Sequence, residues 1–187
     1  MRVIGGLYKG RRLKTVDGLS VRPTSDRMRE TLFNVLRNTV DGSRFVDLCA
    51  GSGAVGIEAL SRGAEHVTFV DSSRRAVTVI QENLTHCEIE GNVRVVNRDV
   101  LATLRYFNSH HLQYDIFYFD PPYDAEIYHQ VMWALAKSRI IAEAGMVIVE
   151  HRAKLPLQPS YEYLRPWREI VQGESALTFF SMERGIA

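Results

Sequence analysis

Asp120, Pro121, Pro122 and Tyr123 form a run in which a carboxylate, two prolines and an aromatic ring directly follow the apolar residues 115–119. The prolines restrict the backbone, so the Asp120 carboxylate and the Pro121 carbonyl could act as two fixed acceptors for one NH2 group. Two such acceptors would turn the lone pair of an aromatic amine toward an electrophile. Tyr123 offers a ring face for stacking a base, worth roughly 1–3 kcal/mol. The run predicts a catalytic site for an exocyclic amine, although the same residue types also form ordinary turns.

Three glycines form a second candidate site. Gly51, Gly53 and Gly56 follow the apolar residues 45–49 and open a predicted helix over residues 53–62. Gly51 allows a tight turn, Gly53 lets a ligand approach the backbone, and Gly56 permits close packing of a helix on a strand. Any adenosine-containing cofactor, NAD included, could use such a loop.

Acidic residues near the ends of predicted strands help to distinguish these cofactors. Asp47 lies before the loop, where it could hold water or the ammonium group of a methionine but would repel the pyrophosphate of NAD. Asp71, with its neighbour Ser72, is placed to bind ribose hydroxyls, and Asp99, with Val100, to bind the adenine amine. These positions favour S-adenosylmethionine, although Asp47 and Asp99 could each simply cap a turn.

The elements that must position these residues alternate between strand and helix. Near-continuous apolar strands are predicted at residues 45–49, 67–70, 93–96, 115–119 and 146–149. Helical segments between them imply a parallel sheet covered on both faces, and ligands bind at the carboxyl ends of the strands in such sheets. Two last strands, residues 168–171 and 177–180, are too close for a helix between them and must pair antiparallel. The predicted fold is therefore α/β, with a mostly parallel seven-stranded sheet, helices on both faces and a C-terminal antiparallel hairpin.

The first 20 residues differ from the rest in composition. Apolar and basic residues alternate between glycines there, which predicts a β-hairpin or extended arm, and residues 21–187 are predicted to form the single remaining domain. Residues 1–30 carry a net charge of +5 within a chain of net +1. A basic arm on a mildly acidic body could contact phosphates, or could simply be a solvated face.

A helix is predicted to follow the arm. Pro23 disfavours a helical Arg22, and Thr24 or Ser25 can cap a helix that opens with Asp26 and runs to about residue 38.

Several classes of protein do not fit this composition. Two cysteines are too few for a disulfide framework and favour a reducing, cytoplasmic setting. No apolar run approaches the ~18 residues that a membrane span needs, and the six histidines lack the spacing of metal ligands. We therefore expect no membrane or metal partner.

Four segments together carry a resemblance to a known family. Residues 22–34, 47–53, 58–64 and 120–123 closely resemble the bacterial 16S ribosomal RNA guanine-N2 methyltransferases, the family that modifies guanine 966 of the small-subunit head. The similarity runs from Gly5-Gly6 to about Glu150, and the segment 22–34 is its most specific part. Cys49 is a departure, since an aromatic residue is expected there; a small buried hydrophobe is compatible with a strand.

The resemblance implies a Rossmann-like class I methyltransferase and a role for each matching residue. Arg22 and Thr24 would close over the methionine end of S-adenosylmethionine. Asp47 and the glycine turn would hold the methionine, Asp71 the ribose and Asp99 the adenine. Asp120 and the Pro121 carbonyl would hold the target amine, and Tyr123 would stack on the base. The basic residues of the arm would contact RNA: Lys9, Arg11, Arg12 and Lys14.

The resemblance also implies a partner, the 16S rRNA of an assembled or nearly assembled 30S subunit, and we expect the chain to act as a monomer. Other functions remain open on the residues alone. An adenine-N6 DNA methyltransferase uses the same four-residue run but usually needs a separate target-recognition region. A methyltransferase for protein side-chain amides, an NAD(P)-binding oxidoreductase and a non-catalytic RNA-binding module are the further alternatives.

Overall fold

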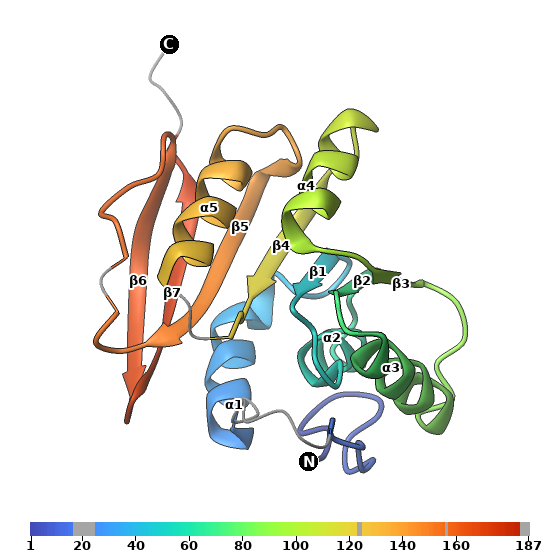
Figure 1. Cartoon of the computed structure of the whole chain (residues 1–187). Helices are drawn as coiled ribbons and strands as arrows, with labels where there is room; N and C mark the ends of the chain where they lie inside the picture. Colours follow the sequence, from blue (N-terminus) through green and yellow to red (C-terminus); the bar gives the residue numbers. More distant parts are fainter. Residues whose placement is uncertain (17–24, 123–124, 156, 184–187) are drawn as a thin grey trace. The chain divides into compact units, whose positions relative to one another are not determined.

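The computed structural model describes residues 1–16, 25–122, 125–155 and 157–183. The chain divides into two compact units, Met1–Asp99 and Val100–Ala187 (Figure 1). The structure has a seven-stranded sheet. Parallel strands with a C-terminal antiparallel pair confirm the predicted α/β class. Among the described residues, no helix has the length and apolar character needed to cross a bilayer.

The first unit is built on three parallel strands, β1 (Arg44–Leu48), β2 (His66–Asp71) and β3 (Val93–Asn97), in the order β3-β2-β1. Helix α2 (Ala54–Ser61) connects β1 to β2, and α3 (Arg74–His86) connects β2 to β3. Right-handed crossovers place successive helices of such a unit on one face of the sheet, and Figure 1 shows α2 and α3 next to each other. β1 and β2 are almost entirely buried, as continuous apolar strands require.

Helix α1 (Asp26–Val35) begins where the sequence predicts and continues as the 3-10 helix η1 (Leu36–Asn38). Its cap is Ser25, whose side chain accepts a hydrogen bond from the Met28 backbone N–H at 3.1 Å, a bond that satisfies one of the free donors of the first turn. Thr24, the other cap considered, lies outside the described residues.

The N-terminal arm is a short antiparallel hairpin, as predicted. Arg2 and Arg12 form a bridge across it, the Val3 N–H donates to the Arg11 carbonyl at 3.0 Å, and the Gly10 N–H donates to the Val3 carbonyl at 2.9 Å. The predicted boundary between residues 20 and 21 lies outside the described residues.

The second unit begins with α4 (Val100–Ser109) and β4 (Tyr114–Phe119), followed by α5 (Ala125–Ala136) and β5 (Ile141–Arg152). β4 and β5 pair in parallel, with a register shift between Tyr114 and Ile116. β5 is longer than the strand predicted at residues 146–149, because it starts five residues earlier and ends three residues later.

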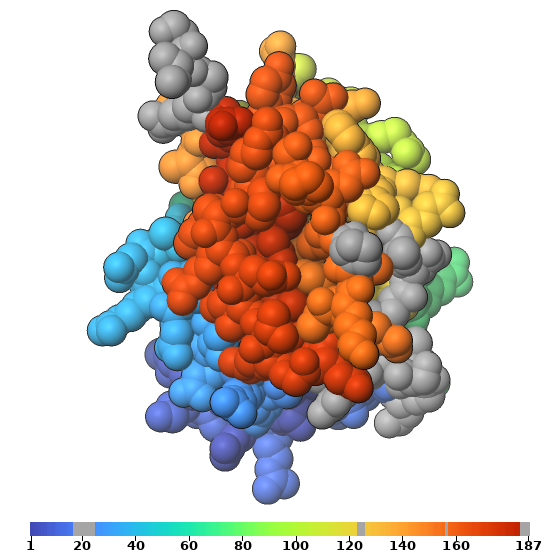
Figure 2. Space-filling view, turned by 90° about the vertical axis from the view of Figure 1, so that its left-hand side faces the viewer, coloured from blue at the N-terminus to red at the C-terminus, as the bar shows by residue number. Residues whose placement is uncertain are grey.

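The unit ends with β6 (Leu164–Gln172) and β7 (Ser175–Met182), which form the predicted antiparallel hairpin. β7 also pairs antiparallel with β5, which gives the order β4-β5-β7-β6. β6 is thus an edge strand. It carries Pro166 and an irregular register between Pro166 and Arg168, both of which discourage pairing with another chain. Figure 2 shows the surface of this hairpin in orange and red.

Candidate functional site

The glycine loop between β1 and α2 adopts the tight turn that the sequence predicts. Gly51 and Gly53 have φ of +56° and +76°, values that L side chains rarely adopt. A Cβ at Gly51 would meet nothing within 4 Å, so the backbone there is open to an approaching ligand, whereas a Cβ at Gly53 would lie 3.2 Å from the Ile80 side chain. A Cβ at Gly56 would lie 2.3 Å from the ring of Phe69, which confirms the predicted close packing of α2 on β2.

Asp71, at the end of β2, connects the glycine loop to the turn that follows β2. One carboxylate oxygen accepts the Gly51 N–H at 2.9 Å and the other accepts the Ser73 N–H at 2.8 Å. A carboxylate offers about four acceptor sites, so these two bonds leave capacity for ribose hydroxyls. Asp71 is held beside the open Gly51 backbone, where a cofactor-binding acid is predicted to lie.

Asp47, near the end of β1, is buried, with 2% of its surface exposed. Its carboxylate accepts the Gly56 N–H at 2.9 Å. Burial raises the pKa of Asp47 to about 7; the Gly56 hydrogen bond opposes this rise, and the negative charge of Asp71 adds to it. A cation beside Asp47 would favour its charged form. Whether Asp47 holds the ammonium group or a water, as the sequence predicts, stays a prediction.

Asn97, the last residue of β3, connects this strand to the end of β2 by hydrogen bonds. The sequence did not single it out. Its amide donates to the carbonyls of Asp71 and Ser72, each at 3.0 Å. The side chains of Ser72 and Asp99 are exposed, and Val100 is the buried first residue of α4. Cofactor contacts of Ser72, Asp99 and Val100 stay predictions.

The predicted catalytic run directly follows β4 in the second unit. Asp120 is half-buried, Pro121 is buried and Pro122 is exposed. The buried Tyr128 hydroxyl on α5 lies 3.2 Å from the Glu150 carbonyl and 3.5 Å from the Pro121 carbonyl, and the Tyr118 hydroxyl donates to the Glu150 carboxylate. Tyr123, like Arg22 and Thr24, lies outside the described residues, and its assigned role stays a prediction.

The four basic residues predicted to contact RNA fall into two pairs. Arg11 and Lys14 form ion pairs at 3.0 Å with Glu88 and Glu82, respectively. Lys9 and Arg12 are exposed, and neither forms an ion pair within the part of the chain that the structure describes. The charges of Lys9 and Arg12 are therefore available to bind phosphates.

The arm is held in place by polar side chains of α2 and α3. The fully buried Glu58 accepts the Ile4 and Gly5 N–H groups at 2.7 and 2.8 Å and the Arg62 Nε at 2.7 Å. A Cβ at Gly6 would lie 1.7 Å from the Ser61 carbonyl oxygen, so only glycine allows this close approach. The Asn83 side chain bonds to both the N–H and the carbonyl of Lys14, at 2.8 and 3.0 Å. The arm is therefore a fixed part of the first unit.

A family model described as "Conserved hypothetical protein 95" matches residues 1–181. The chain belongs to this family. The ribosomal RNA small subunit methyltransferase D of Escherichia coli (strain K12) is 34% identical over 185 residues, which cover 98% of this chain and 90% of that relative. The protein of the same name from Haemophilus influenzae is 34% identical over 160 residues, 84% of this chain and 81% of that relative. Among solved structures, yhhF from Escherichia coli matches with a TM-score of 0.87 and 32% identity over 99% of both chains.

These similarities confirm the family resemblance and the fold predicted from the sequence. Sequence reasoning included Glu58 only as part of the segment 58–64 and missed its contacts with the arm. It also missed Asn83, Tyr128 and the buried pairing of Glu150. The sequence did contain a signal for a buried role of Glu58, because Glu58 is the only charged residue in the apolar helix α2. The roles of Tyr128 and Asn83 depend on contacts between segments that are distant in the sequence, and no local pattern indicates them.

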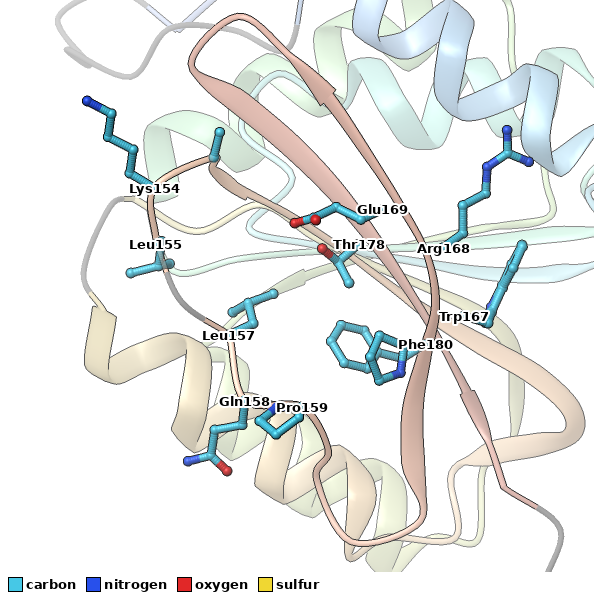
Figure 3. Close-up of a pocket in the computed structure, with 12 residues that line it drawn as sticks. Lys154, Leu155, Leu157, Gln158, Pro159, Trp167, Arg168, Glu169, Thr178 and Phe180 are labelled. Carbon is cyan, nitrogen blue, oxygen red and sulfur yellow. The ribbon is translucent and has the colours of Figure 1, made fainter.

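A groove of about 670 Å³ lies elsewhere in the second unit, between residues 153–155 and 157–159 on one side and the hairpin on the other. Figure 3 shows Thr178 and Glu169 close together on the hairpin, with Leu155 and Leu157 along the facing segment. None of the predicted site residues that the structure describes lines this groove. Within the described residues, no three His, Cys, Asp or Glu side chains gather as a metal site would require.

Proposed function

We propose that the chain is an S-adenosylmethionine-dependent methyltransferase that methylates the exocyclic N2 amine of a guanine in the 16S rRNA of the small ribosomal subunit. The observation that carries the proposal is the similarity along 98% of the chain to a ribosomal RNA small subunit methyltransferase D. The run Asp120-Pro121-Pro122, at the carboxyl end of the parallel strand β4, supports it. Ligands bind at this end of the strands in open α/β sheets.

The first unit supplies residues that fit S-adenosylmethionine. The open backbone of Gly51 and the carboxylate of Asp71 would hold the adenosine and methionine parts, and Asp47 would face the ammonium group. Asp99 would bind the adenine amine, and Arg22 and Thr24 would cover the methionine end. When bound, S-adenosylmethionine supplies an electrophilic methyl group on a positively charged sulfur.

The second unit supplies residues that fit the target amine. The Asp120 carboxylate and the Pro121 carbonyl would each accept one hydrogen of the NH2 group, which leaves the nitrogen lone pair free to react. Tyr123 would stack on the guanine. Once the nitrogen has formed its fourth bond it must release a proton, and Asp120, already bonded to one hydrogen, would accept it.

The proposed substrate is an assembled or nearly assembled 30S subunit, modified by a single copy of the chain in the cytoplasm. Lys9 and Arg12 would contact RNA phosphates from the fixed arm, and Arg11 and Lys14 would hold the arm in place through their ion pairs. A loop base is already unstacked, so the enzyme would not have to open a duplex.

The test supplies tritiated S-adenosylmethionine with unmodified 30S subunits, free 16S rRNA or duplex DNA, and identifies the labelled nucleoside. We expect N2-methylguanosine in 16S rRNA. The Asp120→Ala variant should bind the cofactor almost as well as the natural protein and transfer no methyl group, because Asp120 would contact the target amine and not the cofactor. Methyladenine in DNA would instead support the adenine-N6 alternative, and equal loss of cofactor binding and transfer in the variant would contradict the role of Asp120.

A further inference from the structure

We infer that Tyr128 is a positioning residue, whose hydroxyl holds the Pro121 carbonyl in the orientation that methyl transfer requires. The inference rests on the proposed function, in which this carbonyl accepts one hydrogen of the target amine. Tyr128 lies near the start of α5, and neither its type nor its spacing marked it in the sequence.

The ring of Tyr128 is fixed by its surroundings. The residue is fully buried, and its ring packs edge-on against Phe119, the last residue of β4, with centroids 5.7 Å apart and planes at 64°. Edge-to-face packing of this kind is favourable beyond simple burial. Because the ring is held, the position of the hydroxyl is also held.

The hydroxyl links three elements at one point. It has one hydrogen to donate and two carbonyl oxygens within reach, Glu150 at 3.2 Å and Pro121 at 3.5 Å. The Pro121 contact is the longer and weaker of the two, since O–H···O hydrogen bonds are usually about 2.5–3.0 Å long. The Glu150 side chain is itself held by the Tyr118 hydroxyl on β4. The ends of β4 and β5 and the start of α5 therefore meet at Tyr128.

The two prolines explain why the turn benefits from this link. Pro121 and Pro122 have no backbone N–H, so the turn cannot be fixed by donors of its own at these positions. A hydrogen bond to the Pro121 carbonyl is one way to hold it. A carbonyl oxygen has two lone pairs, and a second remains for the target amine. Losing the bond would let the carbonyl shift, and a displacement of about 1 Å can reduce a reaction rate about 100-fold.

The test compares Tyr128→Phe with Tyr161→Phe. Tyr161 is a matched control because it is also fully buried in the same unit and contacts α5, where its hydroxyl lies 2.8 Å from Nδ1 of His129 and accepts the Gln158 N–H at 3.2 Å. Each variant loses one buried hydroxyl and keeps its ring. With 30S subunits as substrate, we expect Tyr128→Phe to lower kcat about tenfold or more, with KM and the Kd for S-adenosylmethionine changed less than about twofold. Tyr161→Phe should keep the natural kcat.

A second variant separates the hydroxyl from the packing of the ring. Phe119→Leu keeps the Tyr128 hydroxyl but loosens its ring, and an intermediate loss of kcat is expected. Equal kcat values for Tyr128→Phe and Tyr161→Phe would overturn the inference, as would a parallel loss of cofactor affinity in Tyr128→Phe. If the natural protein transfers no methyl group to any substrate, the proposed function fails and the inference with it. An active natural protein with an equally active Tyr128→Phe variant defeats the inference alone.

Discussion

Asp47 is buried beside a backbone donor and close to a second acid, and this environment couples its charge to the stability of the fold. Removing a carboxylate from water disfavours its charged form, and one N–H from Gly56 compensates only in part. The pKa of Asp47 therefore rises from 3.8 to about 7 in the folded chain. At neutral pH the group is close to its titration midpoint, so a nearby cation can readily shift it to the charged form.

The raised pKa of Asp47 predicts how stability depends on pH. Since the folded state holds this proton more tightly than the unfolded state, the contribution to stability is complete below pH 3.8 and is lost as the pH rises toward about 7. The loss is at most about 1.4 kcal/mol per pH unit. Urea unfolding between about pH 5 and pH 7 should therefore show a smaller decrease for Asp47→Asn than for the natural protein. The same slope in both proteins would contradict the assigned shift.

The N-terminal arm and α2 form one unit at the level of elements, because buried Glu58 holds the arm by its backbone. The two N–H groups that Glu58 accepts lie 54 and 53 residues away along the chain. Backbone donors do not depend on the type of side chain, so the arm's exposed residues are free to suit a partner. Leu7, 80% exposed at the tip of the hairpin, is an example.

Replacing Glu58 by glutamine should release the arm. The amide has one acceptor oxygen in place of two and brings a donor toward the Ile4 or Gly5 N–H, so at least one partly buried donor loses its partner. The loss costs about 1 kcal/mol, the low end of the range for buried donors. Hydrogen exchange should accelerate at Ile4 and Gly5 while α3 stays protected. Glu82→Gln is the control, because among the described residues Glu82 forms an exposed ion pair with Lys14, and such pairs contribute about 1 kcal/mol or less. Unchanged exchange in the arm of Glu58→Gln would show that other contacts hold it.

Local patterns predicted the elements, but contacts between elements could not be predicted from them. Helix α3 forms where a helical segment is predicted, between the strands at residues 67–70 and 93–96, because its apolar spacing and its cap are both encoded within a few positions. The first half of β5 was missed because residues 142–145 are small or polar and include Gly145, a composition that strands usually avoid. The acids at the strand ends were predicted by their position, whereas the partners of Asp71 and the contact of Tyr128 with Pro121 depend on segments that only the fold brings together.

At the level of the whole molecule, the charge is almost balanced but unevenly distributed. The net charge of the chain is +1, and its first 30 residues carry +5. A protein of this kind is not attracted to nucleic acid by its overall charge. Its affinity for RNA must come from the cations of one surface, and these must not already be paired with carboxylates of the same chain.

The ion pairs of the arm predict which cations contribute to RNA binding. A lysine or arginine that neutralises a phosphate releases counterions, and each such contact contributes about −0.7 to −0.9 to the slope of log affinity against log salt. Replacing both Lys9 and Arg12 by alanine should therefore make the slope for 16S rRNA less steep by about 1.4–1.8. The matched variant, with Arg11 and Lys14 replaced, should keep nearly the natural slope, because Glu88 and Glu82 already neutralise those two charges. Fluorescence anisotropy over a salt series measures both slopes on the same RNA. If the salt dependence of the second variant falls as much as that of the first, the ion pairs must break on binding and all four cations must reach phosphates. If the salt dependence of neither variant changes, RNA contacts a different surface.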